Sequence, residues 1–115
     1  MAKKHTEIMK AYGRTKKGIT TAWYSKQKAK ERGRPGRKKI AVKYTSKELR
    51  AWTFSQPEFH KIFEKWVKSG YETLLRPSLD RINSLGCYEF SNVQVMTWGD
   101  NLKKYREVDI HNKAI

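Results

Sequence analysis

The sequence has little of what a secreted or membrane protein needs. Its 115 residues include one cysteine, Cys87, which excludes an intramolecular disulfide, a cysteine zinc cluster and an iron–sulfur site. No stretch approaches the roughly 20 consecutive apolar residues of a membrane span. The segment Met1 to His5 also lacks the apolar run of a signal peptide. We therefore expect a cytoplasmic protein without a membrane partner.

Acidic residues are also scarce, and they are unevenly distributed. The chain has 26 Lys and Arg against 11 Asp and Glu, a net charge of +15. Residues 1–50 contain 17 of the basic and three of the acidic residues, whereas residues 51–115 are nearly balanced. Clustered cations bind nucleic acids because they displace the counterions condensed on phosphates. The distribution predicts a basic arm over 1–50 that binds a polyanion; the alternative is a solvated basic face without a ligand.

The basic segment is predicted to form a helix over 15–32, because Ile19, Ala22 and Trp23 recur at helical spacing before a polar second half. Glycine and proline between 33 and 36 end this helix in a basic turn. We expect the contacts with nucleic-acid phosphates to come from basic side chains of the helix and the turn, together with one from the second half of the chain. These are Lys16, Lys17, Lys26, Lys30, Arg32, Arg34, Arg37, Lys38, Lys39 and Lys104.

The second half predicts an α+β fold that is mainly helical. Thr45 and Glu48 form a capping-box pattern, which predicts a short helix from 46. A second helix follows from 57 to 68, with an apolar face of Phe59, Ile62, Phe63, Trp66 and Val67. Then follow a strand over 78–82, a turn-like loop, a strand over 93–96 and a helix over 98–105. We expect a core over 51–108 and a flexible tail over 109–115.

The strand–loop–strand–helix segment contains three polar residues that are candidates for a functional site: Asp80, Asn92 and Asn101. If the hairpin packs against the last helix, Asp80 and Asn101 converge. A carboxylate and an amide oxygen suit Mg²⁺, which keeps several waters and takes phosphate oxygens as further ligands. The alternative is structural, since Asp and Asn at such positions are commonly turn and cap residues.

The sequence of this segment resembles that of the phage-type HNH endonucleases. The motifs are SGY at 69–71, PSLDRIN at 77–83, NVQ at 92–94 and TW at 97–98, followed by Asn101 and Lys104. Together with TKKGI at 15–19 and YT at 44–45, the similarity covers most of residues 15–104. The resemblance implies a C-terminal ββα-metal unit in which a hairpin and a helix hold one Mg²⁺ or Mn²⁺ against double-stranded DNA. It implies no small-molecule cofactor and, if a phage encodes the chain, the cytoplasm of a bacterial host.

If roles are carried over position by position, the resemblance implies that Asp80 is a metal ligand. It also implies that Asn101 stands where the HNH motif has its last histidine. Asn92 becomes the asparagine that ties the hairpin loop. Arg81 departs from typical members, which have a histidine base there; a guanidinium stays protonated, so it suits a phosphate clamp instead. Among the histidines, His60 is the best placed candidate base. Asn83 also departs, because the pattern often has Asp there.

The leading hypothesis is therefore a small nuclease that binds DNA and hydrolyses or nicks phosphodiester bonds with one divalent metal. The absence of a histidine base at position 81 favours a second hypothesis, a catalytically inactive nucleic-acid-binding protein that acts on host machinery. A third, a ribosomal-type RNA-binding protein, fits the charge but does not account for Asp80 and Asn101.

Overall fold

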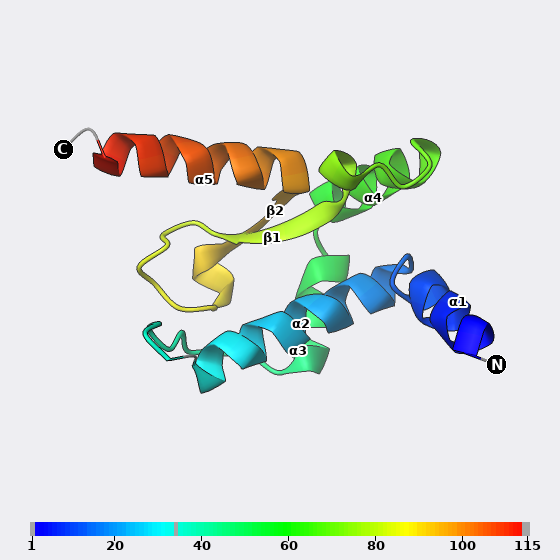
Figure 1. The fold of residues 1–115 in the computed structure, drawn as a ribbon, viewed down its shortest axis with the longest axis horizontal. Coiled ribbons are helices and arrows are strands. Elements are labelled where there is room, and N and C mark those ends of the chain that lie inside the picture. Colours follow the sequence, from blue (N-terminus) through cyan, green and yellow to red (C-terminus); the bar gives the residue numbers. More distant parts are fainter. Residues whose placement is uncertain (1, 34, 114–115) are drawn as a thin grey trace. The chain divides into compact units, whose positions relative to one another are not determined.

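The structure is a computed structural model that describes residues 2–33 and 35–113, and the side chains of residues 7–33 and 35–107. The fold is α+β and mainly helical, as predicted, with one two-stranded antiparallel sheet in the described residues (Figure 1). No helix in the described part of the chain is both long and apolar enough to cross a membrane. The α-helices are α1 (Ala2–Tyr12), α2 (Lys16–Arg32), α3 (Ser46–Phe54), α4 (Pro57–Lys68) and α5 (Trp98–Lys113). The strands are β1 (Pro77–Arg81) and β2 (Val93–Thr97), and the 3-10 turns are η1 (Thr73–Leu75) and η2 (Phe90–Asn92).

The basic helix predicted over 15–32 is confirmed as α2, whose N-terminus is capped by a side chain. The hydroxyl of Thr15 accepts a hydrogen bond of 3.0 Å from the amide of Gly18, which satisfies one free donor of the first turn. Gly18 also allows close packing, because a Cβ there would lie 1.9 Å from the carbonyl oxygen of Tyr12. That contact comes from α1, a helix that the sequence pattern did not predict.

The capping box before α3 and the extent of α4 are confirmed. The Thr45 hydroxyl accepts from the Glu48 amide at 3.1 Å, and the Glu48 carboxylate accepts from the Thr45 amide at 3.0 Å. On α4, Phe59 is fully buried, whereas Val67 is 37% exposed. The predicted apolar face of α4 is therefore wider than the part that is buried.

Helix α5 begins where Thr97 predicts it, since the Thr97 hydroxyl accepts from the Asp100 amide at 3.1 Å. It continues to Lys113, so the predicted end at 105 is wrong, and the helix includes part of the range over which the flexible tail is expected. The physical reason is that neither glycine nor proline follows Gly99, so nothing in the sequence interrupts the helix even though it lacks an apolar stripe. Residues 114 and 115 lie outside the described residues.

The described part of the chain forms two compact units. Residues up to 55 together with 81–93 form one unit, and residues 56–80 together with those from 94 onward form the other. The hairpin loop therefore belongs to the same unit as the basic segment. Tyr88 of the loop makes two backbone hydrogen bonds with residues 41 and 43, at 2.9 and 2.8 Å.

The core of the first unit joins α2, α3 and the segment after the basic turn. Leu49 is fully buried, and the buried hydroxyl of Tyr44 donates to the side-chain oxygen of Gln27 at 2.8 Å. This burial raises the pKa of Tyr44. Phe90 stacks on Tyr44 and on Trp52, with ring centroids 4.8 and 5.5 Å apart. These contacts fix the hairpin loop on the basic half of the chain.

Candidate functional site

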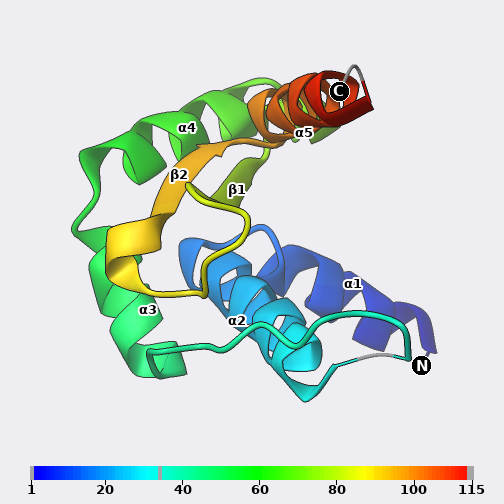
Figure 2. The same ribbon diagram turned by 90° about the vertical axis from the view of Figure 1, so that its left-hand side faces the viewer.

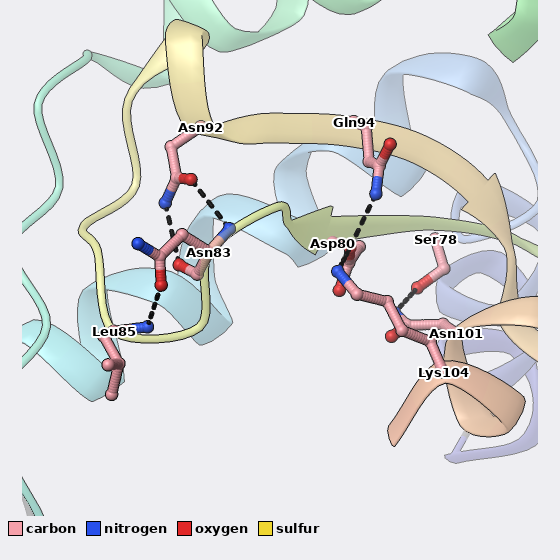
Figure 3. A network of polar contacts seen from close by, with 8 residues as sticks. All are labelled: Ser78, Asp80, Asn83, Leu85, Asn92, Gln94, Asn101 and Lys104. Carbon is pink, nitrogen blue, oxygen red and sulfur yellow. Dashed lines mark hydrogen bonds and ion pairs between the residues drawn. The ribbon is translucent and has the colours of Figure 1, made fainter. Parts of the chain in front are cut away.

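The polar cluster of the second unit lies between β1 and α5. Ser78 and Asp80 are two residues apart on β1, so their side chains share one face of the strand. Asn101 and Lys104 are three residues apart on α5, so they too share a face. The amide nitrogen of Asn101 donates to the Ser78 hydroxyl at 2.8 Å, and the Lys104 ammonium donates to Asp80 Oδ2 at 2.5 Å (Figure 3). Two side-chain pairs thus connect the strand to the helix, and we call these four residues and Gln94 the Asp80 cluster.

The Asp80 carboxylate is nearly buried, at 8% exposure, and its two oxygens differ. Oδ2 accepts from Lys104 and also from the side-chain amide of Gln94, at 2.9 Å. Oδ1 accepts no hydrogen bond from the residues that the structure describes. A buried carboxylate needs a compensating charge, and Lys104 supplies it.

The oxygen atoms that the Asp80 cluster offers as metal ligands fit a hard divalent cation that keeps much of its water. Asp80 offers a carboxylate oxygen, and Asn101 offers an amide oxygen because its nitrogen is used on Ser78. Within the described ranges, no group of three or more His, Cys, Asp or Glu side chains is placed to hold a metal. Such a site would have few protein ligands, which is the usual case for Mg²⁺ bound beside a phosphate.

Lys104 is expected on a phosphate, and the structure places its ammonium on Asp80 instead. Its side chain is 34% exposed, whereas that of Asp80 is 9% exposed. The ammonium can therefore reach solvent or a phosphate, but the buried carboxylate that it leaves then needs another cation to compensate its charge. The sequence pattern did not reveal this ion pair, which joins residues 24 positions apart.

Asn92 closes the hairpin loop of the first unit. Its side-chain oxygen accepts from the Asn83 amide at 2.9 Å, and its nitrogen donates to the Asn83 carbonyl at 3.0 Å (Figure 3). The same nitrogen also donates to the Cys87 carbonyl at 3.0 Å. A Cβ at Gly86 would lie 2.7 Å from that nitrogen, so any other residue there would displace the Asn92 amide. Asn83 Oδ1 accepts from the Leu85 amide at 3.0 Å, which makes an Asx turn.

Arg81 serves the same loop. Its guanidinium donates to the Gly86 carbonyl at 2.8 Å and lies 5.3 Å from the ring centre of Tyr88. Lys30 lies 5.9 Å from the same ring centre and donates to the Tyr88 hydroxyl at 3.2 Å. Two of the expected phosphate-binding cations therefore lie around one buried tyrosine, which holds them in place.

The remaining expected DNA-binding residues lie on α2 and in the basic turn. Lys16 is partly buried, and Arg34 lies outside the described residues. The exposed members are Lys17, Lys26, Arg32, Arg37, Lys38 and Lys39.

Glu31 closes the base of the basic turn. Its carboxylate accepts from the Val42 amide at 2.8 Å and pairs with Lys28. The hydrogen bond from Lys28, followed by that from Val42, lowers the pKa of Glu31. Sequence reasoning missed this role, although an isolated acid in a basic run was the available signal.

His60 lies on the far side of α4 from the face that lines a cavity. That cavity, of about 280 Å³, has Glu58 and Ile62 from α4 and Val95 from β2 in its wall. Two residues along a helix correspond to roughly 200°, which turns His60 away from Glu58 and Ile62. Its ring packs edge-on against Phe59, with centroids 5.4 Å apart. The side chains of the other two histidines lie outside the described ones.

Comparison of the chain with protein-family models, with curated proteins and with solved structures finds no match. Function is therefore inferred from the contacts of the Asp80 cluster, the closed hairpin loop and the exposed cations.

Proposed function

We propose that the protein is a small HNH-type nuclease that binds duplex DNA and hydrolyses or nicks its phosphodiester bonds with one divalent metal. The observation that carries this proposal is the pairing of β1 with α5 through the Asp80 cluster. It sets a carboxylate and an amide oxygen on adjoining elements, with Asp80 Oδ1 unused by the described residues. The motif resemblance supports the same assignment.

In this proposal Asp80 and Asn101 hold Mg²⁺ or Mn²⁺, which supplies the charge that polarises the phosphate and stabilises the leaving oxygen. Ser78 orients Asn101 by accepting its amide proton, so that the amide oxygen is the atom left for the cation. Gln94 orients Asp80 by donating its side-chain amide to Oδ2. Lys104 withdraws its ammonium from Asp80 and places it on a DNA phosphate, where its charge is again compensated.

Proton transfer needs a group other than Arg81. Its guanidinium remains charged at any working pH and binds the Gly86 carbonyl. We assign it to holding the hairpin loop and to the DNA backbone, and keep His60 as the candidate base. A cation held by Asp80 and Asn101 would lower the pKa of a bound water, and a side-chain base would then not be needed.

Binding to DNA is assigned to the first unit. Its exposed cations lie on α2 and in the turn closed by Glu31, within the first half of the chain, which carries nearly all of the net charge. Phosphate contacts of this kind give affinity without sequence preference.

One observation favours the inactive, nucleic-acid-binding alternative. Lys104 and Gln94 already satisfy Asp80 Oδ2, and the ammonium neutralises the carboxylate. A nearly buried ion pair of this kind is stable without a metal. Under this alternative the Asp80 cluster only holds the hairpin on α5.

A plasmid assay separates the two proposals. Supercoiled DNA is incubated with the wild-type protein and Mg²⁺, Mn²⁺ or EDTA, and nicked, linear and retarded DNA are separated on one gel. We expect nicking with either metal and none with EDTA, and Asp80→Asn should abolish nicking without loss of binding. Asp100→Asn is the matched control, because it makes the same change at an exposed position of α5 and should cleave normally. Retardation by the wild type without cleavage under any metal would establish the inactive alternative.

A further inference from the structure

The tip of the hairpin loop presents an apolar side chain to solvent. Leu85 is 91% exposed, more than any other large hydrophobic residue whose side chain the structure describes. An exposed leucine on a mobile loop needs no explanation. This loop, however, is closed by side chains, so its backbone presents Leu85 in one position.

Three sets of contacts fix the loop. Asn92 bonds to both of its arms, Asn83 turns the chain at Leu85, and Arg81 holds the Gly86 carbonyl. Below the tip, the backbone of Tyr88 pairs with residues 41 and 43. A fixed apolar tip loses little conformational entropy when it binds, which favours insertion into a partner.

The charge around the tip indicates the partner. Residues 82–88 contain no charged side chain, although the chain carries +15. Arg81 lies at one end of this neutral stretch, and the segment that pairs with Tyr88 follows directly on the exposed cations at 37–39. Both Figures 1 and 2 show the loop beside that basic segment, within one compact unit.

A neutral apolar tip flanked by cations matches the chemistry of a DNA groove. The cations meet the phosphates at the groove walls, and the apolar tip meets the bases between them. Proteins that enter the minor groove commonly insert a leucine, isoleucine, methionine or phenylalanine between stacked base pairs and so bend the duplex. One leucine is enough for this purpose, whereas a stable protein partner needs a broader apolar patch.

We propose that Leu85 is a wedge that enters the minor groove of double-stranded DNA, unstacks one base step and bends the duplex. This inference rests on the proposed binding of DNA but not on its cleavage. It gives the protein a preference for flexible pyrimidine–purine steps, because those steps unstack at least cost.

The test uses full-length protein in EDTA, which prevents cleavage, and short duplexes that carry 2-aminopurine at a central TA step or within an A-tract. Unstacking raises the fluorescence of 2-aminopurine, and the separation of end labels measured by energy transfer reports the bend. Leu85→Ala removes the wedge and Leu85→Phe keeps it. Leu74→Ala makes the same truncation at another exposed leucine, 52% exposed on η1, and is the matched control.

We expect the wild type, Leu85→Phe and Leu74→Ala to raise the fluorescence at the TA step and to bend the duplex. Leu85→Ala should lose both signals, and its preference for the TA duplex over the A-tract, about tenfold in the wild type, should vanish. Its affinity for the A-tract should persist, because the phosphate contacts remain. Equal fluorescence and bending by Leu85→Ala and wild type would overturn the wedge alone. Absence of binding by the wild type would overturn the DNA-binding proposal as well.

Discussion

The ion pair between Lys104 and Asp80 gives a test of the metal site that does not depend on activity. Lys104→Met removes the ammonium but keeps most of the aliphatic side chain. Asp80 is 8% exposed and Gln94 is its other hydrogen-bond partner, so the variant leaves a nearly buried carboxylate with one neutral partner. Removing one partner of a fully buried pair costs about 3–5 kcal/mol. Because Lys104 is 34% exposed, we expect a smaller loss of about 2 kcal/mol, within the range for an unpaired buried charge.

The assay is thermal unfolding with and without Mg²⁺. In a chain of this size a loss of 2 kcal/mol lowers the Tm by about 8 °C. If Asp80 is a metal ligand, Mg²⁺ replaces the missing positive charge, and at ten times its Kd it restores about 1.4 kcal/mol, or about 5 °C. In the wild type the ammonium competes for the same carboxylate, so the same Mg²⁺ concentration should raise the Tm by less.

Two controls complete this experiment. Lys103→Met removes a neighbouring, exposed ammonium from α5 and should change neither the Tm nor its response to Mg²⁺. The double variant Asp80→Asn, Lys104→Met removes the carboxylate too and should abolish the response. A Tm of Lys104→Met that Mg²⁺ leaves unchanged would refute the metal site and leave a purely structural ion pair.

Three further predictions concern the first unit. Asn92→Ala removes three hydrogen bonds from the hairpin loop, so chemical denaturation should show a loss of about 2–3 kcal/mol; a loss below 0.5 kcal/mol would mean that the loop holds without it. Alanine substitution at residues 37–39 should weaken binding to all DNA sequences. The slope of log affinity against log salt concentration should also decrease by the amount expected for about three phosphate contacts, whereas an unchanged slope would place the contacts elsewhere. The lowered pKa of Glu31 means that its stabilisation is present above its ordinary pKa of 4.5 and is lost as the pH falls below that value. Glu31→Gln should therefore reduce the acid sensitivity of unfolding, and an identical pH profile in the variant would contradict the stabilising role of the Glu31 carboxylate.

The helices that were predicted correctly carry their signals within a few residues. Thr15 and Thr45 cap α2 and α3 through side-chain bonds to amides three positions away, so the sequence contains both partners. Helix α1 was not predicted, although Ile8 and Tyr12 lie four positions apart in the sequence; both side chains remain exposed, Ile8 at 66%. The extension of α5 to Lys113 was missed because periodicity does not detect a helix without an apolar face.

The candidate site was predicted only in part, because its main interactions join distant residues. Strand and helix periodicity places Asp80 and Asn101 on elements that adjoin, and the structure joins these elements through Ser78 and Lys104. No local pattern indicates that Lys104 pairs with Asp80 rather than with a phosphate. The folding of the hairpin loop onto the basic segment likewise depends on the backbone pairing of Tyr88, which joins residues more than 40 positions apart.

The most direct test of the central claim is the single-turnover rate of plasmid nicking as a function of Mg²⁺ concentration, for wild type and Asp80→Asn at saturating protein. The account predicts a rate for the wild type that rises with Mg²⁺ to a plateau, and a rate for Asp80→Asn that is lower by at least about 100-fold, with equal DNA binding. Equal rates for the two proteins, or DNA bound by the wild type and not cut at any Mg²⁺ concentration, would contradict it.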